Sequence, residues 1–313
     1  MSCQSTTNPY QVLDGQAQGT TFHIVYKDDQ ARDFSMAIDS LFRAMDQSMS
    51  LWKPKSVINR INENDPEVIP DIHFTHVFRK AHEIAEATDG ALDVTIGPLV
   101  NAWKIDAQED APFPDSTMID SILTYTGYQK VHMAEGKLVK DDPRIQLDFN
   151  AIAQGYTVDI ISSFFEAQNI SHYLVEVGGE VRVKGVNPEN RHWQIGIDKP
   201  IENSSWRMLQ TSLPLDNLSL ATSGSYRKYR EQFGKKLSHV INPKTGYPAN
   251  HSLLSVSVLA NDCTTADGYA TAFLVMGLEK TMRYAEEHNI QVYCIYADQD
   301  GEFAVRATPD FPN

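Results

Sequence analysis

The alternation of apolar and polar residues predicts a chain that mixes strands with amphipathic helices. Residues 19–26, 173–177 and 254–259 are rich in β-branched and aromatic side chains, which favours strands. Apolar residues recur at helical spacing over residues 31–49 and 75–88, which predicts two helices. Strands and helices alternate without a strict βαβ order, so we predict the α+β class with mixed or antiparallel sheets.

The same patterns predict the remaining elements. They are a helical turn at 57–62 capped by Ser56, a helix at 115–125, a hairpin at 131–139, strands at 181–185, 193–197 and 218–221, helices at 264–276 and 281–288, and a last hairpin over 291–307. We expect a flexible lead over residues 1–16, a single domain over residues 17–308 and a loose polar tail over residues 309–313.

Residues 147–159 hold a carboxylate where a strand is expected to meet a helix. We predict that Asp148 lies near the end of a buried strand, that Asn150 caps the helix that follows, and that Gly155 permits close approach. The spacing predicts an apolar helix face of Ile152, Tyr156, Ile160 and Phe164. The junction is either an ordinary connection or a site for a phosphate and its metal ion.

Two other acids have the same ambiguity. Asp93 lies alone in an apolar run, so it needs either a backbone N–H or a ligand as its partner. Asp267 and Thr271 are four residues apart on one predicted helix and therefore share a face, although acids near a helix N-terminus are also common for electrostatic reasons. A carboxylate, a hydroxyl and a backbone carbonyl from the bend at 150–151 would suit Mg²⁺, which prefers oxygen ligands.

His239 is the best candidate for a general base, because the chain has neither a Ser-His-Asp order nor an HExxH motif. A lone histidine in a strand is more often structural, and that alternative stays open here.

Composition excludes some functions. The 313 residues carry a net charge of −14, which argues against binding nucleic acid or anionic membranes by bulk electrostatics. The three cysteines, Cys3, Cys263 and Cys294, form neither a disulfide framework nor a CxxC zinc motif. Cys3 is either a surface cysteine or the remnant of a lipoprotein signal that would carry a lipid.

An ordered set of motifs resembles the ApbE-like FAD:protein FMN transferases over nearly the whole chain. They are Gly19-Thr20-Thr21, Ser50-Leu51-Trp52 with Ser56 and Asn59-Arg60-Ile61-Asn62, Gly90 to Thr95, Leu147-Asp148 with Ala153-Gln154-Gly155-Tyr156 and Asp159, Val177-Gly178-Gly179-Glu180, Thr222 to Arg227, His239 to Gly246, and Ala266-Asp267 with Ala270-Thr271. Each motif alone is weak, but their order makes the signal specific.

The resemblance implies an α+β fold of two intertwined, T-fold-like subdomains. It implies Mg²⁺-dependent transfer of FMN from FAD to a Thr or Ser hydroxyl of an acceptor protein, with release of AMP. By this resemblance the metal ligands are Asp267, Thr271 and the main-chain oxygen of Ala151, and the base is His239. The FAD contacts are Gln18, Trp52, Ala91, Leu92, Asp93, Asp148, Gln154 and Ile241.

The resemblance also implies a partner and a location. Acceptors in the family are usually subunits of redox pumps, and its members usually lie in the bacterial periplasm or on the outer face of a membrane, often as lipoproteins. Two residues depart from the family pattern: Gln18 replaces a usual Met, and Gln154 replaces a usual basic residue. Two alternatives stay open, a Mg²⁺-dependent FAD pyrophosphatase and a non-catalytic FAD-binding lipoprotein.

Overall fold

The computed structural model describes residues 9–103, 113–201, 208–225, 229–232 and 235–312, and its centre is an antiparallel sheet. In spatial order the strands of this sheet are β1 (Tyr10–Ala17), β2 (Thr20–Lys27), β5 (Tyr173–Val177), β6 (Glu180–Lys184), β9 (Ser219–Gly224), β12 (Leu253–Ala260), β13 (Gln291–Ala297) and β14 (Phe303–Ala307). The α+β class with antiparallel sheets is confirmed.

Three hairpins and eight described helices complete the fold. The hairpins are β3 (Val131–Ala134) with β4 (Lys137–Lys140), β7 (Trp193–Asp198) with β8 (Leu209–Leu215), and β10 (Tyr229–Gln232) with β11 (Lys235–Ser238). The helices are α1 (Ser35–Met49), α2 (Val57–Asn62), α3 (Ile72–Ala87), α4 (Gly97–Trp103), α5 (Ser116–Leu123), α6 (Ala153–Ala167), α7 (Cys263–Met276) and α8 (Leu278–His288), with a 3₁₀ turn at Tyr128–Lys130. Each described helix is too short or too polar to cross a bilayer.

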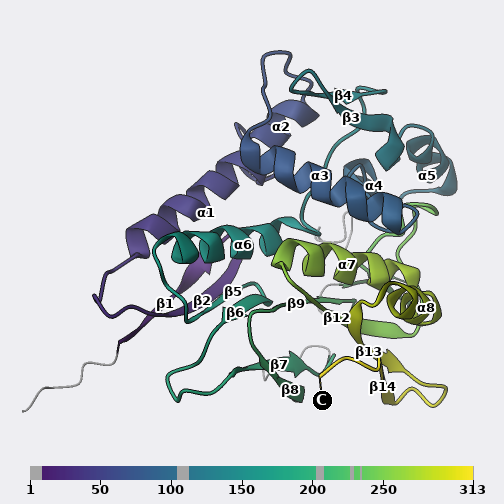
Figure 1. Ribbon diagram of the computed structural model, residues 1–313. Helices are drawn as coiled ribbons and strands as arrows, with labels where there is room; N and C mark the ends of the chain where they lie inside the picture. The colour runs from purple at the N-terminus through teal and green to yellow at the C-terminus, as the bar shows by residue number, and fades with distance from the viewer. Residues whose placement is uncertain (1–8, 104–112, 202–207, 226–228, 233–234, 313) are drawn as a thin grey trace, which may run out of the picture.

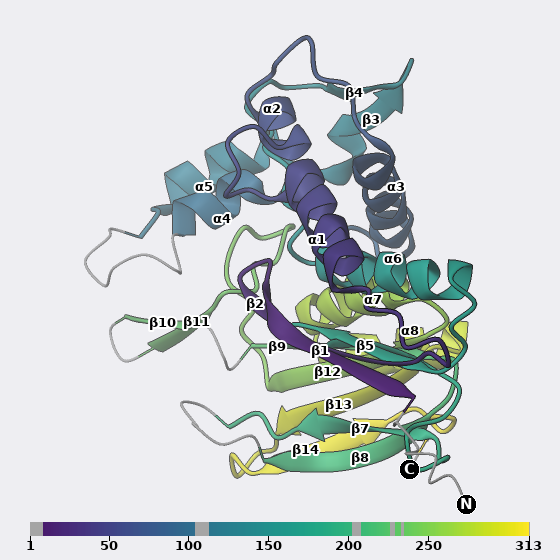
Figure 2. The ribbon, with the colours of Figure 1, turned by 90° about the vertical axis from the view of Figure 1, so that its left-hand side faces the viewer.

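The elements form layers on both faces of the large sheet (Figures 1 and 2). Helices α6 and α7 cover one face, and the β7–β8 hairpin lies against the other. Helices α2 to α5 and the β3–β4 hairpin form a further group beyond α6 and α7. Buried apolar side chains fill each interface, as expected when a sheet and helices each bury one face.

The helical group is inserted between two neighbouring strands of the sheet. β2 pairs with β5, with Ile24 opposite Val175, although a long stretch of chain separates them. The polypeptide therefore leaves the sheet, builds α1 to α5, and returns through α6. This path brings segments that are distant in sequence to one place between the sheet and the helical group.

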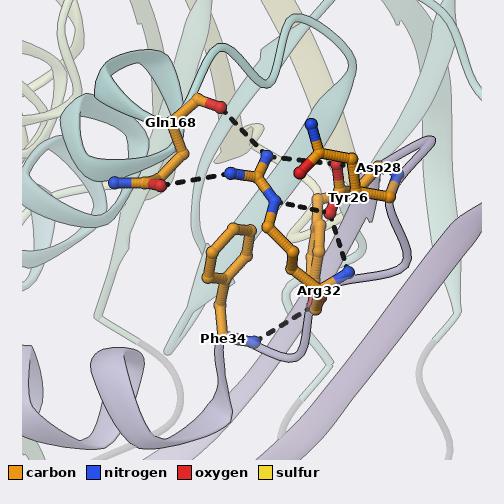
Figure 3. Close-up of polar contacts among 6 residues, drawn as sticks. Tyr26, Asp28, Arg32, Phe34 and Gln168 are labelled. Carbon is orange, nitrogen blue, oxygen red and sulfur yellow. Dashed lines mark hydrogen bonds and ion pairs between the residues drawn. The ribbon is translucent and has the colours of Figure 1, made fainter.

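An ion pair between the half-buried Arg32 and the buried Asp28 connects the start of this excursion to its end (Figure 3). The Arg32 guanidinium donates to both carboxylate oxygens of Asp28, at 2.9 and 3.1 Å, and to the backbone and side-chain oxygens of Gln168 at 3.1 and 3.3 Å. The Arg32 guanidinium also lies over the Phe34 ring. The chain is thereby held at the entry to α1 and at the end of α6.

Most predicted elements are present, but the junction at 147–150 differs from its prediction. Leu147 and Phe149 are buried but form no strand, because the Asn62 side chain bonds both backbone groups of Leu147, at 2.7 and 3.0 Å, in the way a neighbouring strand would. Asn150 does not cap α6, because the helix begins at Ala153 and Ile152 occupies its N-cap position. The Asn150 N–H donates to the Asp148 carboxylate at 2.8 Å.

The buried face of α6 is also rotated from the predicted one. Ile152 and Tyr156 are buried as predicted, but Ile160 and Phe164 are only partly buried. The fully buried apolar side chains of the helix itself are Val158, Ile161 and Phe165. The helix is covered by the sheet, α1 and α7, so contacts on several sides decide its burial.

Both chain ends correct the predicted boundaries. Residues 10–16 belong to edge strand β1 rather than to a flexible lead, because its backbone pairs with β2 even though many of its side chains are polar. The tail is held at Phe311, which is buried against Tyr293. Cys3 and the motif residues 226–228 lie outside the described residues.

Candidate active site

A cavity of about 1420 Å³ lies between the sheet and the helical group. That volume exceeds the several hundred Å³ typical of small-ligand pockets, so it is large enough for a dinucleotide. All the residues assigned from the sequence line it: Gln18, Trp52, Ala91, Leu92, Asp93, Asp148, Ala151, Gln154, His239, Ile241, Asp267 and Thr271. Segments from six separate regions of the chain therefore meet around one space.

The close approach of α6 to α7 shapes one wall of the cavity. A Cβ atom on Gly155 would lie 2.4 Å from the Cys263 carbonyl oxygen and 2.7 Å from the Asp267 Cβ, so only glycine fits. The Gly155 N–H donates to one carboxylate oxygen of Asp267 at 3.0 Å. The N-terminus of α7 is in turn capped by the Asp159 side chain of α6, which accepts the N–H groups of Cys263 and Thr264, each at 2.8 Å.

Asp267 is a buried acid with few partners. Its side chain bonds to Gly155 alone among the described residues, and through only one of its two oxygens. Burial raises the pKa of Asp267 to about 7, the Gly155 N–H opposes that rise, and the negative Asp159 adds to it. A cation would remove this cost, because it would compensate a carboxylate that has no positive partner.

Thr271 lies one turn further along α7, with its hydroxyl 3.0 Å from that of Ser223 on β9. Together with the Ala151 carbonyl, Asp267 and Thr271 supply oxygen atoms only, as Mg²⁺ prefers. The described residues contain no cluster of three or more His, Cys, Asp or Glu side chains suited to a metal. These oxygen donors thus fit a hard cation that keeps several waters.

Asp93 and Asp148 are held by protein donors. Asp93 accepts the Thr95 N–H, the Thr95 hydroxyl and the Tyr128 N–H at 2.7 to 2.8 Å, and burial nevertheless raises its pKa. Burial also raises the pKa of Asp148, whose carboxylate accepts the Asn150 N–H. Asp93 therefore has the backbone partner that the sequence left open, while both acids still line the cavity.

Trp52 contributes an indole ring to the cavity wall and is 76% exposed in a short loop. The Asn59 side-chain amide donates to the carbonyls of Leu51 and Lys53, both at 2.9 Å, and so holds the loop on both sides of Trp52. An exposed indole on a fixed loop is free to stack on a planar ring.

Gln18 and Gln154 lie at the sheet side of the cavity. Gln18 has a left-handed backbone conformation with φ of 53°, and its amide nitrogen donates to the Thr157 hydroxyl at 3.0 Å. The side-chain amide oxygen of Gln18 is buried and has no hydrogen-bond partner among the described residues. The Gln154 amide lies over Gly178, where a Cβ would be 2.7 Å from its nitrogen.

Sequence reasoning assigned no role to several lining residues, among them Ser223 and Glu180. Both belong to motifs that the sequence displayed, but only the sheet shows that β9 places Ser223 beside Thr271 and that β6 buries Glu180 at the cavity. Asn59 was likewise visible within a motif, yet its support of the Trp52 loop depends on contacts that no sequence pattern reports.

A family model described as the ApbE family matches residues 18–295, which spans every residue of this site. The chain belongs to the ApbE family. Relatives include the protein named FAD:protein FMN transferase of Haemophilus influenzae, 35% identical over 99% of this chain and 92% of that protein. The protein of the same name from Vibrio cholerae is 36% identical over 92% of this chain and 88% of its own length.

Solved ApbE structures agree with this fold. The flavin transferase ApbE from Vibrio cholerae superposes with a TM-score of 0.86 at 33% identity, covering 96% of this chain and 98% of that one. The ApbE protein from Thermotoga maritima superposes with a TM-score of 0.84 at 27% identity, over 96% and 97% of the two chains. The chain therefore matches the ApbE family in both sequence and architecture over nearly its full length.

Proposed function

We propose that this protein is a Mg²⁺-dependent FAD:protein FMN transferase, which moves FMN from FAD to a Thr or Ser hydroxyl of an acceptor protein. The observation that carries the proposal is one dinucleotide-sized cavity that joins the buried acid Asp267 to the imidazole-bearing residue His239. Its relatives named FAD:protein FMN transferase support the same activity.

The residues of the cavity divide the chemical task. Trp52 and the segment 91–93 offer surfaces for the planar rings of FAD. His239 takes the proton of the acceptor hydroxyl while the oxygen of that hydroxyl forms a new bond to the FMN phosphorus. The bond between that phosphorus and the bridging oxygen breaks, and AMP leaves with that oxygen. A positioned base of this kind contributes roughly 10²- to 10⁴-fold in rate.

Asp267, Thr271 and the Ala151 carbonyl would hold the Mg²⁺ ion. When bound, the ion neutralises pyrophosphate charge, as a Lewis acid and template. This help matters in a chain with a net charge of −14, and more so because Gln154 supplies no positive charge to the phosphates.

The test combines purified protein with FAD, Mg²⁺ and candidate acceptor proteins, followed by mass spectrometry of the products. We expect an FMN adduct on the acceptor and free AMP, both lost with EDTA. His239→Ala should abolish transfer and leave FAD binding intact. A fully active His239→Ala protein would refute the base assignment. Release of free FMN without labelling of the acceptor would instead favour the FAD pyrophosphatase. Binding of FAD without any turnover would favour the non-catalytic FAD-binding lipoprotein.

We further propose that the acceptor is a redox-pump subunit and that the protein works in the periplasm or on the outer face of a membrane, held by a lipid on Cys3. The family resemblance supports these proposals. Mass spectrometry of the native protein checks the last, since an unmodified Cys3 would contradict the lipid.

A further inference from the structure

The segment that carries His239 closes on itself as a compact loop. The Asn242 N–H donates to the Tyr247 carbonyl at 2.9 Å, the Gly246 N–H to the Asn242 carbonyl at 2.8 Å, and the Ala249 N–H to the Val240 carbonyl at 2.8 Å. An isolated bridge also pairs Ile241 with Pro248. Residues 240–249, named here the base loop, therefore move as a unit, and His239 directly precedes that unit.

The tip of the base loop is fixed to α4 and α5. The indole N–H of Trp103, the last residue of α4, donates to the Gly246 carbonyl at 2.7 Å in a buried contact. Gly246 has a φ of 73°, and a Cβ there would lie 2.5 Å from the Ile119 side chain of α5, so the backbone packs directly on that helix. The Tyr247 ring meets the Trp103 ring edge-on, with 5.7 Å between centroids.

This contact links the base loop to the rest of the cavity wall. Ile241, which lines the cavity, is buried in one cluster with Leu99, Ala102 and Trp103. Val100 and Asn101 of the same helix also line the cavity. A second contact, an ion pair, joins Lys244 of the loop to Asp89, which lies beside the segment 91–93. Trp103 itself does not line the cavity, so it touches neither the substrate nor the reacting atoms.

We infer that Trp103 is a positioning residue for the transfer reaction: its indole N–H fixes the base loop and thereby the location of His239 relative to the bound dinucleotide. The inference rests on the proposed function for its consequence in catalysis. A displacement of about 1 Å of a reacting group costs as much as 10²-fold in rate, so loss of one buried hydrogen bond at the loop tip is sufficient to slow turnover.

The chain contains a matched control. Trp193 on β7 is equally buried, and its indole N–H also donates to a backbone carbonyl, that of Lys184 at 3.1 Å. It packs on the opposite face of the sheet and does not line the cavity. Trp103→Phe and Trp193→Phe therefore remove the same kind of hydrogen bond while each keeps a large aromatic ring.

The experiment compares both variants with the unmodified protein in two assays. The first measures kcat for FMN transfer at saturating FAD and acceptor, together with the Kd for FAD. We expect Trp103→Phe to lower kcat about 10- to 100-fold with the Kd changed less than about twofold, and Trp193→Phe to leave both within about twofold. Equal loss of kcat in the two variants, or an unchanged kcat in Trp103→Phe, would overturn the inference.

The second assay is hydrogen exchange of the base loop, which needs no substrate. Trp103→Phe should speed exchange over residues 240–249, and Trp193→Phe should not. An unchanged exchange rate of the base loop in Trp103→Phe rejects the inference, whether or not the unmodified protein transfers FMN. Absence of FMN transfer by the unmodified protein is a separate result, which rejects the proposed function. Should Trp103→Phe not fold, Tyr247→Leu removes the packed ring from a 41% exposed position and carries the same two assays with the same expected directions.

Discussion

Three buried aspartates, Asp93, Asp148 and Asp267, face the cavity, and their partners distinguish them. Asp93 accepts three protein hydrogen bonds, whereas Asp267 accepts only the Gly155 N–H among the described residues. A carboxylate that is well bonded can remain ionised as part of the wall. One that is buried and nearly unpartnered is costly unless a cation joins it, which is why we propose Asp267 as the metal ligand.

Asp267→Asn provides the test at this position. The amide oxygen still accepts the Gly155 N–H and costs less to bury, so we expect a folded protein whose melting temperature in EDTA is unchanged or higher. Mg²⁺-dependent transfer should fall roughly 100-fold or more, as when a single electrostatic group is removed. Asp262→Asn is the control, because Asp262 is the N-cap residue of α7, where its side chain accepts the Thr265 N–H, and Asn caps a helix equally well. Retained Mg²⁺ dependence in Asp267→Asn would contradict the ligand assignment.

Gly155→Ala tests the contact between α6 and α7. In an ordinary helix this change stabilises by about 1 kcal/mol. Here the added methyl meets the Cys263 carbonyl and the Asp267 Cβ, so we expect a lower melting temperature and weaker activation by Mg²⁺. Thermal melting and a Mg²⁺ titration of activity measure the two effects. A more stable and fully active variant would show that the helices can separate without consequence.

At the scale of elements, the Asp28–Arg32 pair decides how α1 leaves the sheet. Hydrogen bonds from the Arg32 side chain hold the pKa of Asp28 below its usual range. A lowered pKa in the folded state contributes stability that is present above the ordinary value of about 4 and is lost as the pH falls through the folded value. The pair therefore protects the fold at neutral pH and less so in acid.

Asp28→Asn should reduce the free energy of unfolding by about 1–3 kcal/mol at pH 7, because it weakens hydrogen bonds to a charged group. Urea denaturation at pH 7, 5 and 3.5 measures the difference from the unmodified protein, which should shrink at the lowest pH. Turnover should stay within about twofold, since Asp28 does not line the cavity. A difference that grows as the pH falls would exclude the ion pair as the cause.

At the scale of the whole molecule, the cavity joins segments from both sides of the insertion, so its ligand should bind the folded state alone. FAD at 100 times its Kd then stabilises by about 2.7 kcal/mol. We expect FAD with Mg²⁺ to raise the melting temperature more than FAD alone, and we expect that increment to vanish in Asp267→Asn. An increment of equal size in the variant would place the metal elsewhere.

Local sequence patterns predicted the secondary-structure elements better than the contacts that build the site. Residues 173–177 form a strand with the predicted bounds, because alternation along a strand is a local property. The stretch 147–150 was mispredicted, because the groups that bond its backbone come from Asn62 and Val94, far away in the chain. The sequence motifs identified the candidate cavity residues. Only the fold shows that the Asn59 side chain holds the Trp52 loop and that the Trp103 side chain holds the base loop.

The sequence by itself determined the α+β class, most of the helices and strands, and the residues that carry the family resemblance, since these depend on local periodicity and on residue identity. Tertiary structure decided that those residues surround one cavity, because β2 pairs with β5 across the long insertion. It also decided that Asp93 accepts three protein hydrogen bonds while Asp267 accepts one among the described residues. Burial and hydrogen-bond partners are set by segments that meet in space and not along the chain.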